Sequence, residues 1–135
     1  MRPTATPLQR INVEGGDVLH VLKSQDRTFR GFAEAYFSLI RKDIIEPWRR
    51  HHHATLNLVV PSRAVRFVAT IRGDAFEETI FSSQNSFARL TIPPGPWLAF
   101  QGLQKEESII LNISDRIHQG NEIDHCGLNK FNYEW

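Results

Sequence analysis

Features that would direct this protein into a membrane, out of the cell or onto nucleic acid are scarce in its sequence. The 135 residues include one cysteine, Cys126, which cannot form an internal disulfide and therefore fits a reducing compartment. The longest apolar run, around residues 56–61, is far shorter than the ~20 residues that cross a bilayer. Residues 1–9 lack the apolar core of a signal peptide. We therefore expect a cytoplasmic protein that makes no membrane contact.

An excess of charge of one sign is also missing. The chain has 16 Lys and Arg against 15 Asp and Glu, so its formal net charge is +1. Binding to nucleic acid or to an anionic membrane through bulk electrostatics needs a strongly basic surface, so neither is an expected partner. The content of hydrophobic residues (41%) and charged residues (23%) is that of one ordinary globular domain. We predict a single domain over residues 1–135, with an N-terminal arm at 1–14 and a C-terminal tail at 116–135.

Short runs of β-branched and aromatic residues recur along the chain, with Gly and Pro turns between them. Residues 27–41 have the spacing of an amphipathic helix, but Gly31 and the aromatic alternation favour a strand. Residues 61–64 have the right length for a hairpin turn, and residues 121–128 are compatible with a short helix or turn. This pattern predicts an all-β sandwich or barrel. The predicted strands are residues 18–23, 33–40, 55–60, 65–71, 79–82, 88–92, 97–100 and 108–113.

Three segments, read in order, carry a resemblance to a known family. The first is residues 26–37, with Arg30-Gly31-Phe32 followed by Glu34; the second is Trp48-Arg49-Arg50-His51 with the two strands after it. The third is residues 85–95, which end in Pro93-Pro94-Gly95, together with Asn112-Ile113-Ser114-Asp115. They resemble the family of dTDP-4-dehydrorhamnose 3,5-epimerase. The resemblance implies a single-domain, cupin-type jelly roll (a double-stranded β-helix barrel) that works as a homodimer without a cofactor.

The same resemblance implies an epimerase acting on a nucleotide-linked 4-keto-6-deoxy sugar, with His51 as the base. Epimerisation beside a ketone removes a proton and returns it on the opposite face, and imidazole has a suitable pKa of about 6.5. The enolate-stabilising lysine of the family would fall near Asn57, its acidic tyrosine near Leu111, and a further histidine at Leu98. A 3,4-ketoisomerase and a non-catalytic sugar-nucleotide-binding cupin therefore stay open as alternatives. The residues predicted to supply the missing catalytic group are Arg50, His53 and Tyr36.

Candidate substrate-binding residues accompany this catalytic set. Arginine forks match phosphate oxygens, so Arg30, with Glu34, is expected to contact the nucleotide; exposed ion pairs are the alternative. Arg66 alternates with apolar neighbours and would enter the cavity if its sheet face is the inner one. The predicted substrate-binding set is Arg30, Glu34, Arg50, Asn57 and Arg66.

The run His51-His52-His53 raises the question of a metal. Cupins often bind a metal through His-x-His, a downstream Glu and a later His, and His51 and His53 would share one face of a strand. Asn57 stands where the Glu would be, and Leu98 stands where the last His would be. Two ligands are too few for a closed metal site, so we expect no metal.

Overall fold

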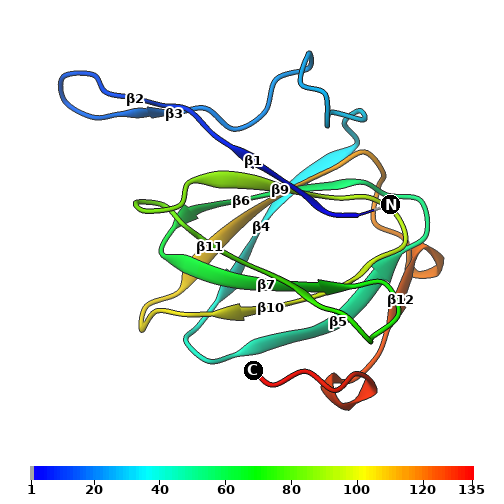
Figure 1. Ribbon diagram of the computed structural model, residues 1–135. Coiled ribbons are helices and arrows are strands. Elements are labelled where there is room, and N and C mark those ends of the chain that lie inside the picture. The colour runs from blue at the N-terminus through cyan, green and yellow to red at the C-terminus, as the bar shows by residue number, and fades with distance from the viewer. Residues whose placement is uncertain (1) are drawn as a thin grey trace.

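The computed structural model describes residues 2–135 and consists of two five-stranded antiparallel sheets that enclose one core (Figure 1). The prediction of a single all-β domain of the jelly-roll type is confirmed. The first sheet has the order β1 (Thr4–Pro7), β9 (Ala88–Ile92), β6 (Leu56–Ser62), β11 (Ser108–Ser114), β4 (Glu34–Ile40). The second has the order β12 (Ile123–His125), β5 (Ile45–His51), β10 (Trp97–Gly102), β7 (Ala64–Thr70), β8 (Glu77–Ser82).

Two smaller parts extend from this body. Strands β2 (Arg10–Ile11) and β3 (Val18–Leu19) pair only with each other and form a hairpin that projects from the first sheet (Figure 1). The C-terminal region contains two short 3₁₀ turns, η1 (Gly120–Glu122) and η2 (Leu128–Lys130), on either side of β12. Within residues 2–135, no helix is long and apolar enough to cross a membrane.

The core lies between the two sheets because side chains alternate between the faces of each strand. Leu58 of β6, Phe67 of β7 and Ile110 of β11 are each about 1% exposed and belong to this inner cluster. The residue on either side of each points outward. This alternation decides which of the polar residues reach the space between the sheets.

A second apolar cluster covers the outer face of the second sheet. Trp48, Val68 and Trp97 project from β5, β7 and β10 and are buried there by the C-terminal segment. The aromatic residues of that segment, Phe131 and Trp135, pack on Trp48 with ring centroids 5.3 and 5.9 Å away. Figure 1 shows the C-terminus running along the outside of β5. Strand β5 therefore separates two clusters, one on each of its faces.

Several sequence-based expectations need correction. Residues 61–64 do not form a hairpin turn: β6 and β7 belong to different sheets, and the chain crosses between them at Arg63, whose φ is 71°. The predicted strand at 18–23 is limited to β3. Residues 121–128, expected as a short helix or turn, contain the end of η1 and the start of η2, with the strand β12 between them, where residues 123–125 pair with β5. The expected arm at 1–14 includes β1, which pairs with β9, and β5 itself was not predicted as a strand.

Candidate active site

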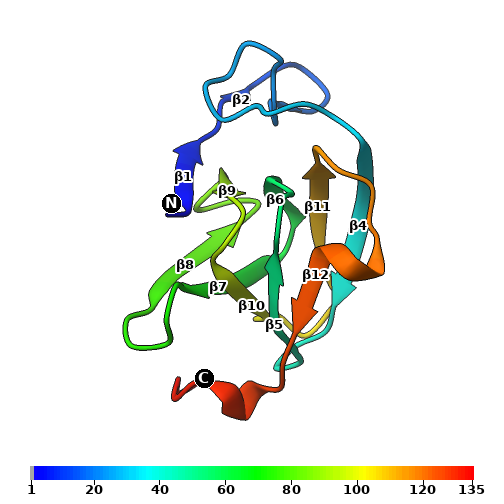
Figure 2. The ribbon, with the colours of Figure 1, turned by 90° about the vertical axis from the view of Figure 1, so that its right-hand side faces the viewer.

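A cavity of about 390 Å³ opens between β4 of the first sheet and β5 and β10 of the second. Ser38 and Ile40 line it from β4, Glu46 and Arg49 from β5, and Phe100 from β10. The segment before η1 comes close to the start of β4 (Figure 2), where the backbone N–H of His118 donates to the Glu34 carboxylate at 2.8 Å. The loop after β11 is therefore tied to the start of β4.

Strand register shows which residues of β5 lie on the inner face of the sheet; Glu46 and Arg49 line the cavity itself, whereas His51 does not. Arg49 lies opposite Leu98, a core residue, whereas Arg50 lies opposite Trp97 of the outer cluster. His51 is two residues from Arg49 and so shares its inner face. The two strand neighbours Arg49 and Arg50 therefore serve opposite sides of the sheet.

His51 is the buried imidazole of the site. Its exposed fraction is 8%, and its Nδ1 lies 4.0 Å from Oε1 of Glu122. This Nδ1 is buried and makes no hydrogen bond with any atom of residues 2–135. Burial lowers the pKa of His51, and the opposing effect of the Glu122 charge is smaller. The imidazole is therefore neutral near pH 7 and able to accept a proton.

Glu122 is held as a carboxylate by the segment that follows His51. It accepts hydrogen bonds from the backbone N–H groups of His53 and Ala54 at 2.7 and 2.6 Å, and from Nδ1 of His53 at 2.9 Å. Burial acts to raise the pKa of Glu122, but the hydrogen bonds from His53 and Ala54 outweigh it and lower the pKa to about 2. A carboxylate that keeps its negative charge therefore stands 4.0 Å from Nδ1 of His51.

Tyr36 lies on the inner face of β4. Its strand partner on β11 is Asn112, whose amide donates to Ser38 Oγ at 3.1 Å. Burial raises the pKa of Tyr36, the charge of Arg49 lowers it to a smaller extent, and Glu34 raises it. The phenol therefore keeps its proton at neutral pH and is able to donate it.

Arg49 is one of two arginines that line this cavity, the other being Arg41. Its guanidinium forms an ion pair with Glu46. Its Nε is buried and has no hydrogen-bond partner in the described part of the chain. A buried donor without a partner costs roughly 1–3 kcal/mol, so its retention calls for an explanation.

The structure brings together some of the predicted site residues and separates others. His51, Tyr36 and Glu34 belong to the inner faces of β4 and β5, and His53 lies at the rim beside Glu122. Arg30 is exposed in the loop before β4 and donates to backbone carbonyls of that loop.

The other three predicted substrate-binding residues, Arg50, Asn57 and Arg66, are on outer faces. Arg50 bonds Asp124 and stacks 4.5 Å from the Trp97 ring centre. Asn57 accepts from Thr91 and Arg89, and Arg66 donates to Gln101 under the C-terminal segment. Strand alternation turns all three away from the cavity, because their neighbours in sequence are core residues.

Two residues near this site, Arg49 and Glu122, were not in the predicted set of site residues. Arg49 would have been found by the alternation rule, since it is two residues before His51. Glu122 lies 71 positions after His51 in a segment without a recognisable motif, and only the pairing of β12 with β5 brings it there. His125, opposite Arg49 in the same pairing, was also given no role.

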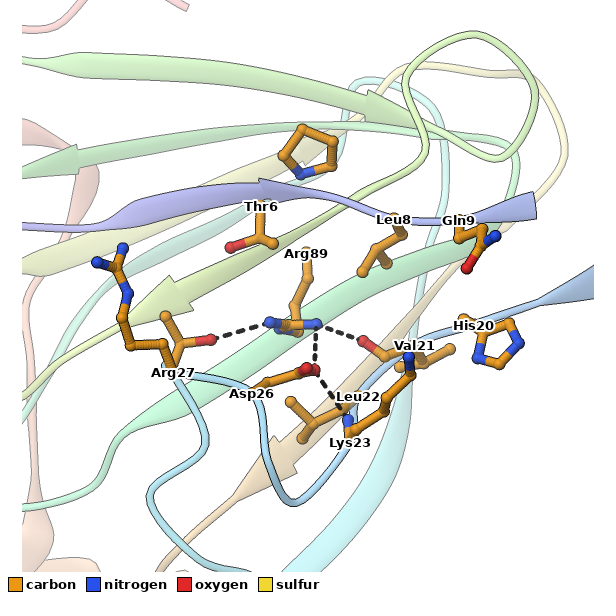
Figure 3. A pocket seen from close by; sticks show the side chains of 12 residues that line it. Thr6, Leu8, Gln9, His20, Val21, Leu22, Lys23, Asp26, Arg27 and Arg89 are labelled. Carbon is orange, nitrogen blue, oxygen red and sulfur yellow. Dashed lines mark hydrogen bonds and ion pairs between the residues drawn. The ribbon is translucent and has the colours of Figure 1, made fainter. Parts of the chain in front are cut away.

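A separate cavity of about 260 Å³ lies on the outer face of the first sheet (Figure 3). Arg89, 2% exposed, donates to the Val21 carbonyl at 2.6 Å and to Thr28 Oγ1 at 2.9 Å, and pairs with Asp26. Its donors are thus used to hold the loop of residues 20–28 against the sheet. This cavity has a structural explanation.

Within residues 2–135, no group of three or more His, Cys, Asp or Glu side chains could hold a metal ion. His53 instead uses its Nδ1 to bond Glu122, and His52 bonds Asp124 at 2.9 Å. The histidine run is thus divided among three different surroundings.

No family model matches the sequence, and no curated protein matches it. Solved structures do resemble it. A dTDP sugar isomerase from Desulfovibrio desulfuricans G20 superposes with a TM-score of 0.92 at 23% identity, over 98% of this chain and 90% of that one. A sugar 3,4-ketoisomerase from Thermoanaerobacterium thermosaccharolyticum, solved with TDP, gives 0.78 at 15% identity over 90% and 86% of the two chains.

A third similar structure is the dTDP-6-deoxy-D-glucose-3,5-epimerase of Legionella pneumophila, solved with dTDP-4-keto-L-rhamnose. Its TM-score is 0.77 at 15% identity, over 91% of this chain and 71% of that one. At such identities the likeness establishes architecture. This chain therefore has the cupin-type jelly-roll fold found in the dTDP-sugar isomerases and epimerases.

Proposed function

We propose that this protein is an epimerase of a nucleotide-linked 4-keto-6-deoxy sugar and that His51 is its base. The observation that carries the proposal is the pair of His51 and Glu122 on the inner face of the barrel. Glu122 lies 4.0 Å from Nδ1 of His51, and Nε2 of the neutral ring is the proposed proton acceptor. Similar structures are named as a dTDP sugar isomerase and a dTDP-6-deoxy-D-glucose-3,5-epimerase, and these names support the choice of substrate class.

The chemistry follows from the order of proton transfers. The C3–H bond breaks, the proton moves to Nε2 of His51, and the electron pair moves to the carbonyl oxygen to form an enolate. Tyr36, which remains protonated, is the proposed acid that returns a proton on the opposite face. Neither step needs a redox partner, and we propose that the protein acts without a metal.

A 3,4-ketoisomerase is the second candidate, because several of the similar structures are named as 3,4-ketoisomerases. It starts with the same loss of the C3 proton but returns a proton at C4. A non-catalytic sugar-nucleotide-binding protein is the third. All three are expected to bind the nucleotide, and only the first two exchange the C3 proton with solvent.

The test is proton exchange in heavy water with dTDP-4-keto-6-deoxyglucose, followed by NMR of the C3 and C5 protons and by identification of the product. We expect deuterium at C3, and a loss of at least about 100-fold in exchange rate for His51→Gln. His52→Gln is the matched control, since His52 bonds Asp124 on the outer side; its rate should stay near that of the wild type. Equal rates in both variants would refute the assignment of His51, and binding without exchange would favour the third candidate.

Metal independence has its own measurement. Exchange should survive treatment with EDTA and removal of the chelator by dialysis. A loss of exchange that added metal restores would contradict this part of the proposal.

We also propose that the protein is a homodimer formed through β4. This strand is the last in the order of its sheet, and its outer face exposes Phe37 (66%) and Leu39 (58%). Exposed aromatic and aliphatic residues on a sheet edge are typical of association sites.

A further inference from the structure

The proposed reaction creates negative charge on the carbonyl oxygen, and a cation or strong donor must meet that charge. The position at which a lysine was expected holds Asn57. Asn57 lies on the outer face of β6, where Thr91 and Arg89 donate to its side-chain oxygen. Asn57 therefore cannot reach the inner cavity, and another group has to stabilise the enolate oxygen.

Arg49 is placed to do so. Its strand register with Leu98 puts it on the inner face, two residues from His51, and side chains at this spacing lie about 6.6–7 Å apart, comparable to the width of a hexose ring. The positive charge of Arg49 also lowers the pKa of both His51 and Tyr36.

The hydrogen bonding of Arg49 adds an independent observation. Glu46 holds the guanidinium by one terminal nitrogen, which fixes its orientation. The buried Nε has no partner among residues 2–135, although Arg49 lines the cavity of about 390 Å³. An oriented donor without a protein acceptor, beside a cavity, is suited to an acceptor that arrives with the substrate.

We propose that Arg49 is a catalytic residue that stabilises the enolate oxygen by donating hydrogen bonds to it. The inference rests on the proposed function. When His51 takes the C3 proton and the electron pair moves to the carbonyl oxygen, Arg49 keeps all its protons and supplies positive charge. The bond it donates becomes stronger as the oxygen becomes negative, so its effect is on the rate of the chemical step.

The competing role for an arginine in this cavity is binding of the nucleotide diphosphate. The two roles differ in what they change. A phosphate contact acts on the binding of any nucleotide, including dTDP without a sugar, whereas an enolate contact acts on kcat. Arg50 provides the matched control because it is the same residue type, one position away, on the outer face with Asp124.

The experiment compares Arg49→Gln, Arg49→Lys and Arg50→Gln for C3 exchange, kcat, KM and dTDP affinity by calorimetry. We expect Arg49→Gln to lower kcat by roughly 100- to 1,000-fold while its dTDP Kd stays within about threefold of wild type. Arg49→Lys should recover part of the loss, and Arg50→Gln should keep kcat within about threefold.

Other outcomes would overturn the assignment. If kcat is unchanged in Arg49→Gln, Arg49 does not stabilise the enolate. If the dTDP affinity falls tenfold while kcat is intact, Arg49 binds the nucleotide instead. If circular dichroism shows that Arg49→Gln does not fold, Arg49→Lys becomes the deciding variant. If Arg49→Lys folds and binds dTDP normally but its kcat is no higher than that of His51→Gln, the proposal that the charge at position 49 stabilises the enolate is refuted. Absence of exchange in the wild type refutes the proposed function, whereas a normal wild-type rate with an unaffected Arg49→Gln refutes only this inference.

Discussion

At the scale of single residues, the surroundings of His51 determine its chemistry. Burial keeps its imidazole neutral, and the backbone holds it on both sides: its carbonyl accepts from the Gly95 N–H at 3.0 Å, and the next N–H donates to the Glu122 carbonyl at 2.9 Å. Glu122 joins the base to the C-terminal region. The charge of that carboxylate should therefore matter for stability as well as for catalysis.

Glu122 predicts a specific dependence of stability on pH. Its pKa falls from 4.5 to about 2 on folding, so the unfolded chain takes up the proton first as the pH drops. Its stabilising contribution is complete above pH 4.5 and disappears as the pH falls towards 2. Glu122→Gln should flatten the decline of unfolding free energy between pH 5 and pH 3, measured by urea denaturation at several pH values. Glu106→Gln, at a largely exposed position, is the control and should leave the decline as in wild type; an equally steep decline in Glu122→Gln would contradict the role.

At the scale of elements, β5 and the C-terminal segment depend on each other. The β5 sequence was not recognised as a strand because Pro47 and the charged residues 46, 49 and 50 weaken its propensity. What stabilises it is distant in sequence: Trp48 is buried by Phe131 and Trp135, and β12 pairs along its edge. The strands that were predicted, such as residues 88–92, carry their own alternation of apolar residues.

Gly73 tests the packing of the C-terminal segment. Its φ is +85°, and a Cβ there would lie 2.2 Å from a ring carbon of Phe131. Gly73→Ala should therefore lose stability through backbone strain, roughly 1–3 kcal/mol, and should also displace Phe131 from Trp48. Urea denaturation and tryptophan fluorescence are the measurements.

Gly95→Ala is the control for this variant, since its φ is +114° but nothing lies within 4 Å of the added Cβ. It should show the strain without a change in the native fluorescence. Identical fluorescence in the two variants would mean that the C-terminal segment tolerates the added methyl group.

At the scale of the whole molecule, residue patterns predicted the architecture better than the site. Alternation and turn residues act locally, so the all-β fold and most strands of the body followed from them. The inner or outer position of Asn57, Arg66 and Arg50 depends on which sheet faces the core, and that follows only from strand pairing across the chain. The roles of His51 and Tyr36 came from the family resemblance and stay predictions.

The proposed homodimer is also a property of the whole molecule. Phe37→Asp places a charge on the exposed face of β4, so it should shift the mass in solution from twice 15.6 kDa towards 15.6 kDa, measured by light scattering after size exclusion. Ile80→Asp is the control, because Ile80 is 44% exposed on β8, at the far edge of the other sheet. A dimer through β4 would be refuted if the wild type is monomeric. It would also be refuted if Phe37→Asp and Ile80→Asp both keep the mass of the wild type.

The two-sidedness of β5 has a consequence for anyone who wishes to redesign this protein. Odd positions 49 and 51 look into the barrel, and even positions 48 and 50 support the aromatic shell outside. A mutant library aimed at a new sugar preference can thus be confined to alternate codons of one strand and its partners on β4. Randomising the intervening codons would spend most of the library on clones that fail to fold.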